Sequence, residues 1–279
     1  MGKQDSSHTA LVTAYLRAAH QIIDSGPRVL DDPIALHLLG PKAEERIRGR
    51  NVKFMSDKAK ALRAHVMLRS RYAEDQLKLS MARGTSQYIL LGAGFDTFAF
   101  RQPPWAAGLR IFEVDHSGTQ REKQSRIFNA GITVPKNLIF VKIDFEKESL
   151  EDRLAAADVR KDEPTFFSWL GVTMYLTEEA VDSTLRYMAG FARGSEAVIT
   201  FLQPPDGSTS SHELAERVAE AGESFISRFT PERFEEKLRA AGFHKVCFLT
   251  HDLSAPFFPE NGSSLSNPRR TSIVSALVL

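Results

Sequence analysis

The spacing of apolar residues along the chain changes near position 85. Before that position, apolar residues recur every third or fourth residue, which is the period of an amphipathic helix. The first such segment ends at Gly26-Pro27, a pair that stops helices, and Asp32-Pro33 is a start signal for the next. Helices are therefore predicted over residues 9–23, 34–39 and 55–81.

After that position, short apolar runs alternate with amphipathic segments. Strands and helices in regular alternation need crossover connections, which give a parallel sheet. Between the last two strands there is only a loop at 255–268, rich in Pro, Gly, Asn and Ser, so these two strands should be antiparallel. Strands are predicted at 87–91, 110–114, 138–143, 165–170, 197–202, 245–250 and 272–279, and helices at 97–101, 117–130, 149–157, 178–191 and 231–241.

This pattern predicts an α/β fold with a doubly wound, seven-stranded, mostly parallel sheet of the Rossmann-like type. The length of 279 residues suits a single domain. Residues 1–84 would form a helical N-terminal cap and residues 85–279 the core. A helix at 208–228, within an insertion at about 204–229, is not required by the alternation. We expect it to lie with the N-terminal helices over the carboxyl edge of the sheet.

A glycine turn and an acid stand where a nucleoside would bind. Gly92, Ala93 and Gly94 end the first apolar run, and Asp115 ends the second, 21 residues after Gly94. In an open α/β sheet, a glycine turn lets a ligand lie against bare backbone, and a carboxylate that closes the next strand hydrogen-bonds both ribose hydroxyls. The spacing predicts a nucleoside site. The structural alternative is a tight turn that binds no ligand.

The residues after the glycine turn favour one kind of nucleoside. A dinucleotide fingerprint has a third glycine where this chain has Thr97, and Asp96 would repel a pyrophosphate at a helix N-terminus. A carboxylate at this position suits an amino group instead. A ligand with a ribose, no phosphate and an amino acid tail is S-adenosylmethionine, which we therefore predict as the cofactor.

A second acid follows the third predicted strand. Asp144 could accept a hydrogen bond from the exocyclic amine of adenine, and the neighbouring Phe145 could cover a face of the ring. Asp144 could equally cap the helix that begins near Ser149. The series of glycine turn, Asp115 and Asp144 favours the ligand.

Two arginines precede the first strand. Arg69 or Arg71 could hold the carboxylate of the methionine part as a bidentate donor. Such charges usually lie on a solvated helix face, so we expect only one of the two to contact the ligand. Arg101, after the glycine turn, is interpreted as a surface or structural residue.

The loop after the fourth strand should face the methyl group, because this strand borders the switch point of a doubly wound sheet. Methyl transfer is an in-line displacement at a sulfonium, which a dry, aligned slot accelerates. The aromatic residues Phe166, Phe167 and Trp169 could line such a slot, although plain core packing is expected for one or two of them. Tyr175 is our candidate for the catalytic side chain closest to the acceptor.

Charge and composition narrow the partners. A net charge of +1, from 36 basic and 35 acidic residues, provides no field that would attract nucleic acid or an anionic membrane. We expect a small-molecule acceptor, and a monomer or homodimer. Residues 1–7 are polar and lack the apolar core of a signal peptide, and no window approaches a membrane span, which predicts a cytoplasmic protein.

Cysteine and histidine usage provides no further chemistry. Cys247 stands alone, which excludes an internal disulfide and a cysteine-based metal site, and its predicted strand suggests a buried side chain. The eight histidines lack metal-site spacing, so no metal is predicted, and none stands out as a catalytic base. A carboxylate acceptor is already ionised and needs no base, whereas an alcohol needs one. The missing base favours a carboxyl or acidic phenol acceptor.

Several short motifs, spread over most of the chain, occur together in one known family. They are Thr9-Ala10 with Arg17-Ala18, Asp32-Pro33-Ile34-Ala35, Leu68-Arg69-Ser70-Arg71-Tyr72-Ala73-Glu74-Asp75, Leu91-Gly92-Ala93-Gly94-Phe95-Asp96-Thr97 with Phe100-Arg101, Phe112-Glu113-Val114-Asp115-His116, Asp144-Phe145, and Gly171-Val172-Thr173-Met174-Tyr175-Leu176. With these motifs the chain resembles the leucine carboxyl methyltransferase and polyketide O-methyltransferase family of class I S-adenosylmethionine-dependent enzymes, in its bacterial branch.

The resemblance implies roles for these residues. It places Arg69 or Arg71 on the cofactor carboxylate, Gly92, Ala93 and Gly94 under the methionine part, Asp115 with His116 at the ribose, and Asp144 with Phe145 at the adenine. Many members have a Glu just before the glycine of the strand-four loop, where this chain has Leu170. The cofactor amino group would then be held by backbone carbonyls or by Asp96. The family does not fix the acceptor, because its members act on a protein C-terminal carboxylate, on polyketides and on other molecules.

The sequence thus predicts an S-adenosylmethionine-dependent O-methyltransferase that acts on a carboxylate or hydroxyl of a small molecule. Two alternatives stay open at this point. One is a nicotinamide-dependent oxidoreductase on a similar sheet, against which the missing third glycine argues. The other is a nucleoside-binding protein that methylates nothing, which Leu170 keeps open.

Overall fold

The computed structural model describes residues 8–145, 147–205, 225–259 and 263–279. Its strands lie close to the predicted positions. They are β1 (Gln87–Leu91), β2 (Arg110–Asp115), β3 (Leu138–Lys142), β4 (Thr165–Trp169), β5 (Glu196–Thr200), β6 (Lys245–Phe248) and β7 (Ile273–Leu277).

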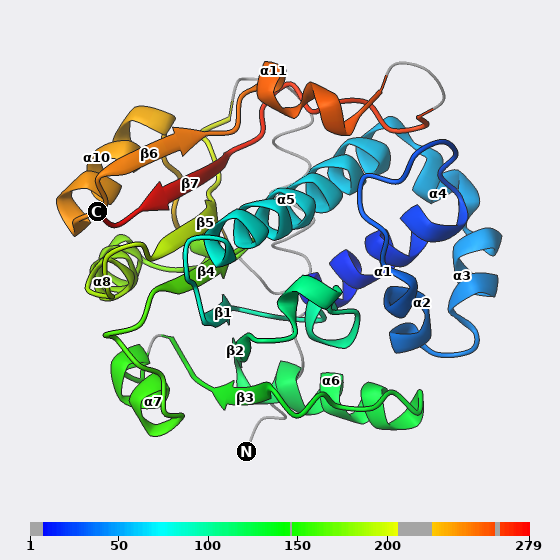
Figure 1. The fold of residues 1–279 in the computed structure, drawn as a ribbon. Coiled ribbons are helices and arrows are strands. Elements are labelled where there is room, and N and C mark those ends of the chain that lie inside the picture. Colours follow the sequence, from blue (N-terminus) through cyan, green and yellow to red (C-terminus); the bar gives the residue numbers. More distant parts are fainter. Residues whose placement is uncertain (1–7, 146, 206–224, 260–262) are drawn as a thin grey trace.

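These strands form one seven-stranded sheet in the order β3-β2-β1-β4-β5-β7-β6 (Figure 1). The first five strands pair in parallel, and β7 inserts between β5 and β6, antiparallel to both. The predicted α/β fold with a mostly parallel sheet is therefore confirmed, as is the antiparallel final pair.

Most of the described helices also match their predictions. These are α1 (His8–Ile22), α2 (Pro33–Leu39), α5 (Asp57–Met81), α6 (Ser117–Asn129), α7 (Leu150–Ala156), α8 (Glu178–Ala189) and α10 (Pro231–Ala241). Two short helices, α3 (Ala43–Gly49) and α4 (Asn51–Met55), were not predicted. At seven and five residues, these helices are too short to show a helical period of apolar residues.

Two predictions about connections differ from the structure, and a third lies mostly outside the described residues. Residues 97–101 form only a 3₁₀ turn, Phe98–Phe100, because the Asp96 carboxylate accepts from the N–H of Phe98 and prolines follow at 103 and 104. The loop between β6 and β7 contains a short helix, α11 (His251–Ser254), capped by Thr250. The predicted helix at 208–228 falls mostly outside the described residues, and residues 225–228 have no regular secondary structure.

Alternate residues of the central strands face two helical layers. On β1, Tyr88 and Leu90 pack in one core with residues of α5, such as Leu68. Ile89 and Leu91 pack in a second core with residues of α7, α8 and α10. Figure 1 shows α5 lying along one face of the sheet. Burial on both faces explains why the strands read as continuous apolar runs in the sequence.

The edge strand corrects one prediction. Cys247 is exposed rather than buried. It lies on β6, at the edge of the sheet, where Lys245 also points to solvent while Val246 and Phe248 pack against the core. A strand covered on one face alternates in burial, and Cys247 falls on the open face.

The N-terminal helices gather at one end of the sheet. Figure 1 shows α1, α2, α3 and α4 side by side there. Their shared core includes Phe95, directly after the glycine turn, and Ile127 of α6. The helices are therefore packed against the segment that leaves β1. Within the described ranges, no helix combines the length and apolar character that crossing a lipid bilayer requires.

Candidate functional site

The register of the parallel strands brings the predicted residues to one edge of the sheet. The last residue of β1 is level with the residue before Asp115, and β2 is in turn aligned with β3, after which Asp144 follows. On the other side of β1, β4 runs alongside and leads to Gly171. The glycine turn, both acids and the strand-four loop thus lie in a row at the carboxyl edge, where open α/β sheets bind their ligands.

The glycine turn is packed from both sides by the protein itself. Gly92 and Gly94 have φ values of 67° and 52°, in the left-handed region that favours glycine. A Cβ on Gly92 would come 2.3 Å from a methyl group of Val172, and a Cβ on Gly94 would come 3.3 Å from the Cβ of Ala10. The two glycines predicted to leave room for a ligand are therefore also needed for packing, because α1 and the strand-four loop approach their backbone closely. Ala93, between the glycines, donates its N–H to the carbonyl of Val114.

Asp115 is held in place by backbone donors. Its Oδ2 accepts from the N–H of Gly94 at 2.5 Å, and its Oδ1 accepts from the N–H of His116 at 2.7 Å. Burial raises the pKa of Asp115, and these two hydrogen bonds oppose the rise. An ionised carboxylate can accept about four hydrogen bonds. The residue is partly exposed, so capacity for two hydroxyl donors remains.

His116 contributes to this edge through both its side chain and its backbone N–H. It is the N-cap residue of α6, with its Nδ1 accepting from the N–H of Gly118 at 3.3 Å. Its own N–H holds Asp115, as described above.

Asp144 and Phe145 stand beyond β3. The Oδ2 of Asp144 accepts from the Nζ of Lys147 at 2.9 Å. Helix α7 is capped by Ser149, whose hydroxyl accepts from the N–H of Asp152 at 3.2 Å, so the capping alternative for Asp144 was wrong. Phe145 is partly buried and packs against the core on the α8 side.

The two arginines of α5 differ in their surroundings. Arg71 pairs with Asp75, with 2.9 Å between Nε and Oδ1, and its side chain is 43% exposed. Arg69 is partly buried, and its Nε has no hydrogen-bond partner among the residues that the structure describes. Of the two, the structure brings Arg69 to the site and leaves Arg71 outside it.

The electrostatic surroundings of Arg69 favour the binding of an anion. Burial and, to a smaller extent, the guanidinium of Arg17 lower the pKa of Arg69 to about 10, while Tyr175 and Asp96 oppose the shift. At that pKa the side chain is still charged at neutral pH. A partly buried charge with an unpaired donor is unfavourable on its own, and a carboxylate would satisfy it.

The strand-four loop closes against Arg69. Gly171 has a φ of 77°, and a Cβ on it would come 2.5 Å from Nη1 of Arg69. Tyr175 ends the 3₁₀ turn Thr173–Tyr175, and its ring lies 5.7 Å from that of Phe225. The slot expected here is not lined by Phe166, Phe167 or Trp169, because all three are fully buried core residues.

Asp96 is already engaged within the protein. Its Oδ2 pairs with Nη2 of Arg17 at 2.9 Å, and the same guanidinium nitrogen donates to Ser70 at 3.0 Å. Burial alone would raise the pKa of Asp96, but Arg17 and Arg101 together hold it below its usual value. Asp96 therefore lies at the site as an ionised carboxylate whose charge α1 already balances.

Thr97 fastens the glycine turn to the N-terminal helices. Its hydroxyl donates to Asp32 at 2.6 Å and accepts from the Nε of Arg101 at 3.1 Å. Arg101 also pairs with Glu74 of α5. Thr97, which stands where a dinucleotide motif has its third glycine, is thus a buried structural residue, and the nicotinamide alternative loses its support. Arg101 is structural, as interpreted from the sequence.

Two residues at the site were missed. Arg17 lies on the same side of α1 as Ala10 and Ala14, at helical spacing, and a charge on such a small-residue face was a usable signal. His65 precedes Arg69 by one helical turn on α5. Nothing in its local sequence distinguishes it from the other histidines.

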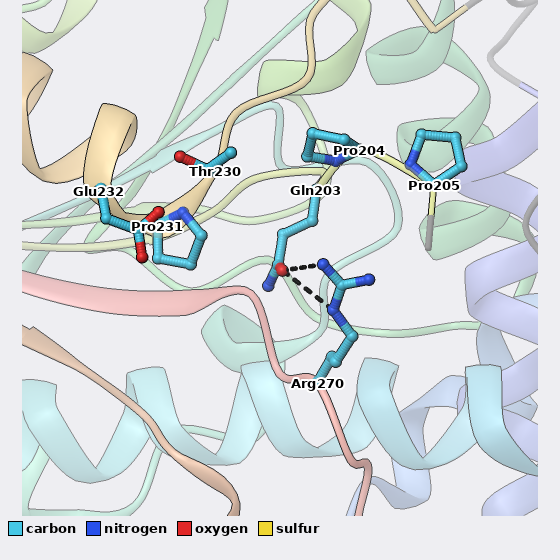
Figure 2. Close-up of a pocket in the computed structure, with 7 residues that line it drawn as sticks. All are labelled: Gln203, Pro204, Pro205, Thr230, Pro231, Glu232 and Arg270. Atoms are coloured by element: carbon cyan, nitrogen blue, oxygen red, sulfur yellow. Dashed lines mark hydrogen bonds between the residues drawn. The ribbon is translucent and has the colours of Figure 1, made fainter. Parts of the chain in front are cut away.

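A groove lies at the carboxyl end of β5 (Figure 2). The guanidinium of Arg270 donates to the side-chain oxygen of Gln203, and the amide nitrogen of Gln203 donates to Ser272 at 2.9 Å. Hydrogen bonds therefore hold the side chains of Gln203 and Arg270, which line this groove beside β5. Its volume is about 530 Å³, and it is lined by Gln203, Pro204, Pro205, Thr230, Pro231, Glu232 and Arg270.

Comparison with known proteins adds to this geometry. The family model described as leucine carboxyl methyltransferase matches residues 10–189. The YktD protein of Bacillus subtilis, named as a candidate S-adenosyl-L-methionine-dependent methyltransferase, is 31% identical over 293 residues, which cover 95% of this chain and 96% of that one. A protein of Parafrankia with the same kind of name is 31% identical over 195 residues, covering 66% of this chain and 59% of that protein.

Solved structures share the fold at low sequence identity. A Streptomyces avermitilis protein aligns with a TM-score of 0.60 at 14% identity, over 98% of each chain. A candidate methyltransferase from Thermobifida fusca aligns with a TM-score of 0.56 at 19% identity, over 86% of this chain and 90% of that one.

Proposed function

The chain belongs to the leucine carboxyl methyltransferase family of S-adenosylmethionine-dependent methyltransferases, and from this premise we propose that it methylates an oxygen atom of a small molecule. The acceptor oxygen belongs to a carboxylate or a hydroxyl. The observation that carries the assignment of the site is the buried Nε of Arg69, which has no hydrogen-bond partner among the described residues although Arg69 lies beside Gly171 at the carboxyl edge of β4. When bound, S-adenosylmethionine supplies an electrophilic methyl group.

Arg69 holds the carboxylate of the methionine part in this proposal. The support is physical: the side chain is charged and partly buried, and its Nε finds no partner within the described part of the chain. Arginine donates to a carboxylate through two parallel hydrogen bonds, which fixes the orientation of the ligand as well as its position. Because Gly171 has no Cβ, the guanidinium can approach its backbone closely.

The acids along the sheet edge hold the nucleoside part. Asp115 accepts from the ribose hydroxyls with the lone pairs that its backbone donors leave free. Asp144 and Phe145 receive the adenine, and the backbone of Gly92, Ala93 and Gly94 borders the methionine part. His116 positions Asp115 through its N–H.

Asp96 attracts the cofactor amino group, although Arg17 shares its charge. Leu170, in place of the Glu common in the family, is partly buried among apolar residues and offers no hydrogen bond from its side chain. The amino group therefore depends on Asp96 and on backbone carbonyls for its acceptors.

The acceptor lies on the Tyr175 side of the site. Tyr175 and Phe225 provide a partly buried aromatic wall beyond Gly171, and Tyr175 lies close enough to Arg69 to influence its pKa. Such a wall aligns an acceptor and excludes water from the displacement. Tyr175 is the proposed catalytic side chain, in contact with the acceptor oxygen.

Labelled cofactor tests this function directly. Protein is incubated with a cell extract and S-adenosylmethionine labelled in its methyl group, and the labelled product is isolated. Mild alkali hydrolyses a methyl ester and releases labelled methanol, whereas an aryl or alkyl methyl ether is stable. Either result supports oxygen as the acceptor atom and also tells a carboxylate from a hydroxyl. Label on nitrogen, sulfur or carbon would overturn the proposal.

Two controls make the result interpretable. Asp115→Asn keeps the shape of the side chain but loses the charge that accepts both hydroxyls, so it should lower transfer together with S-adenosylhomocysteine affinity. Wild-type protein that binds S-adenosylhomocysteine in calorimetry but transfers no label would point to a nucleoside-binding protein without transferase activity.

A further inference from the structure

His65 and Arg69 share one face of α5. Within residues 63–70, these two side chains keep partial exposure, while the other six are buried. Residues four apart on a helix lie one above the other, with Cβ atoms about 5–6 Å apart. His65 therefore opens onto the same space as the Arg69 guanidinium.

The direction of α5 places His65 on the acceptor side. The helix ends at Met81 and leads to the start of β1, at the amino edge of the sheet, whereas Arg69 touches Gly171 at the carboxyl edge. The part of α5 that precedes Arg69 in the sequence therefore extends beyond the carboxyl edge of the sheet. His65 thus stands one turn, about 6 Å, beyond Arg69 along the helix axis.

The surroundings keep His65 neutral. Burial and the charge of Arg69 lower its pKa to about 3. Arg69 is the charged group that lowers the pKa of His65, and Arg17, Tyr175 and Asp96 in turn surround Arg69. His65 has no hydrogen-bond or ion-pair partner in the part of the chain that the structure describes. A neutral imidazole with an unoccupied nitrogen can accept a proton.

We propose that His65 is the general base of the reaction and that the acceptor group is therefore a hydroxyl rather than a carboxylate. This inference rests on the proposed function. As the acceptor oxygen bonds to the methyl carbon, its proton passes to a ring nitrogen of His65, and the electron pair of the broken carbon–sulfur bond stays on sulfur. The imidazolium then returns its proton to solvent.

Cofactor binding would raise the pKa of His65. A carboxylate held by Arg69 would neutralise that charge and remove the repulsion that disfavours protonated His65, which is the smaller of the two causes of the lowered pKa; burial is the larger. The basicity of His65 rises when the site is loaded, which couples proton acceptance to the presence of the methyl donor.

The first test measures the His65 pKa by NMR titration of its Cε1 proton, with S-adenosylhomocysteine as the probe. We expect the pKa to rise on addition of the probe in wild-type protein. In Arg69→Gln, it should already be raised without the probe. A His65 pKa that the probe leaves unchanged in wild-type protein would overturn the coupling.

The second test uses His65→Asn with a series of substituted phenols of graded acidity. The rate should fall by about a hundredfold to ten-thousandfold for weakly acidic phenols and much less for acidic ones, which are ionised without a base. S-adenosylhomocysteine affinity should stay within twofold of wild type, which shows that the variant is folded.

Three outcomes would count against the inference. An equal loss for all phenols indicates a structural role for His65, and an unchanged rate excludes a base. If wild-type protein methylates carboxylates but no phenol, the proposal that the acceptor group is a hydroxyl is wrong. Failure of wild-type protein to bind S-adenosylhomocysteine would instead remove the proposed function itself.

Discussion

The guanidinium of Arg69 occupies the place where a side chain on residue 171 would begin. A Cβ on Gly171 would come 2.5 Å from Nη1 of Arg69, and Gly171 has a φ of 77°. Residue 171 is therefore glycine for two reasons, its backbone conformation and the close approach of a cation. Helix α5 and the strand-four loop, far apart in the sequence, meet at this contact.

Gly171→Ala should lower both the affinity for the cofactor and the free energy of unfolding, and the loss of affinity should exceed that of a variant with a similar loss of stability. The methyl group pushes the guanidinium away from the backbone, and the left-handed conformation adds about 1–2 kcal/mol of strain. Gly131→Ala is a matched control, since Gly131 has a φ of 65° and nothing within 4 Å of its Cβ position. Calorimetry with S-adenosylhomocysteine and urea denaturation separate the two effects. Equal loss of affinity in both variants would contradict the role given to the contact.

Replacing the two arginines of α5 should have unequal effects. Arg69→Gln is expected to lower S-adenosylhomocysteine affinity by about 10- to 100-fold, because a hydrogen bond to a charged group contributes about 1.5–3 kcal/mol. Arg71→Gln removes a half-exposed pair with Asp75 and should leave affinity within about twofold. A larger loss of S-adenosylhomocysteine affinity in Arg71→Gln than in Arg69→Gln would contradict the assignment of Arg69 to the cofactor site.

The sequence could not decide between these arginines. Two residues two positions apart on a helix point about 200° apart, so at most one faces the sheet edge, and tertiary packing alone selects it. The pairing of Arg17 with Asp96 has the same origin, because nothing local links α1 to the glycine turn. His65 could not be singled out from the sequence because its lowered pKa depends on burial beside Arg69.

Other parts of the structure were readable from the sequence because their signals are local. Strands buried on both faces appear as mostly apolar runs, and Asp115 is the last residue of such a strand, β2. Register then places Asp115 beside the glycine turn without further information. Helices α3 and α4 escaped detection because they bury too few side chains to reveal a period, and Cys247 was misplaced because its strand lies at the sheet edge.

The buried pair between Glu113 of β2 and Lys123 of α6 should behave as a unit. Their N–O distance is 2.6 Å, and both side chains are 1% exposed. At a pH above 7, where Glu113 is ionised, Lys123→Met alone leaves the buried carboxylate without a counter-charge and with its Oε1 already unpartnered in the described structure, and should cost about 3–5 kcal/mol. Glu113→Met with Lys123→Met replaces the pair by apolar side chains and should cost far less. Urea denaturation of both single variants and the double variant measures this; additive losses would contradict it.

Glu113 should also lower stability as the pH rises toward neutrality. Burial raises its pKa to about 7, and Lys123 limits the rise. The unfolded chain releases this proton near pH 4.5, whereas the folded protein keeps it up to about pH 7, so the stability contributed by the protonated form is lost across that window. Glu113→Gln cannot ionise and should flatten this part of the profile. A midpoint in urea that falls equally steeply for both proteins between pH 4.5 and 7 would argue against the raised pKa.

His65 should have the opposite effect, at lower pH. Burial and the charge of Arg69 lower the pKa of His65 in the folded protein to about 3. Between about pH 6.5 and pH 3, the imidazole is therefore protonated in the unfolded chain but neutral in the folded protein. The stability associated with neutral His65 is complete above about pH 6.5 and is lost as the pH falls toward 3. His65→Asn should therefore lose less stability than wild type between pH 6.5 and 4, measured as the urea midpoint at successive pH values. His37→Asn, at an exposed position, is the control and should follow the wild-type slope. Should His65→Asn follow that slope as well, the imidazole would titrate freely in the folded protein, and it could not be held neutral beside Arg69.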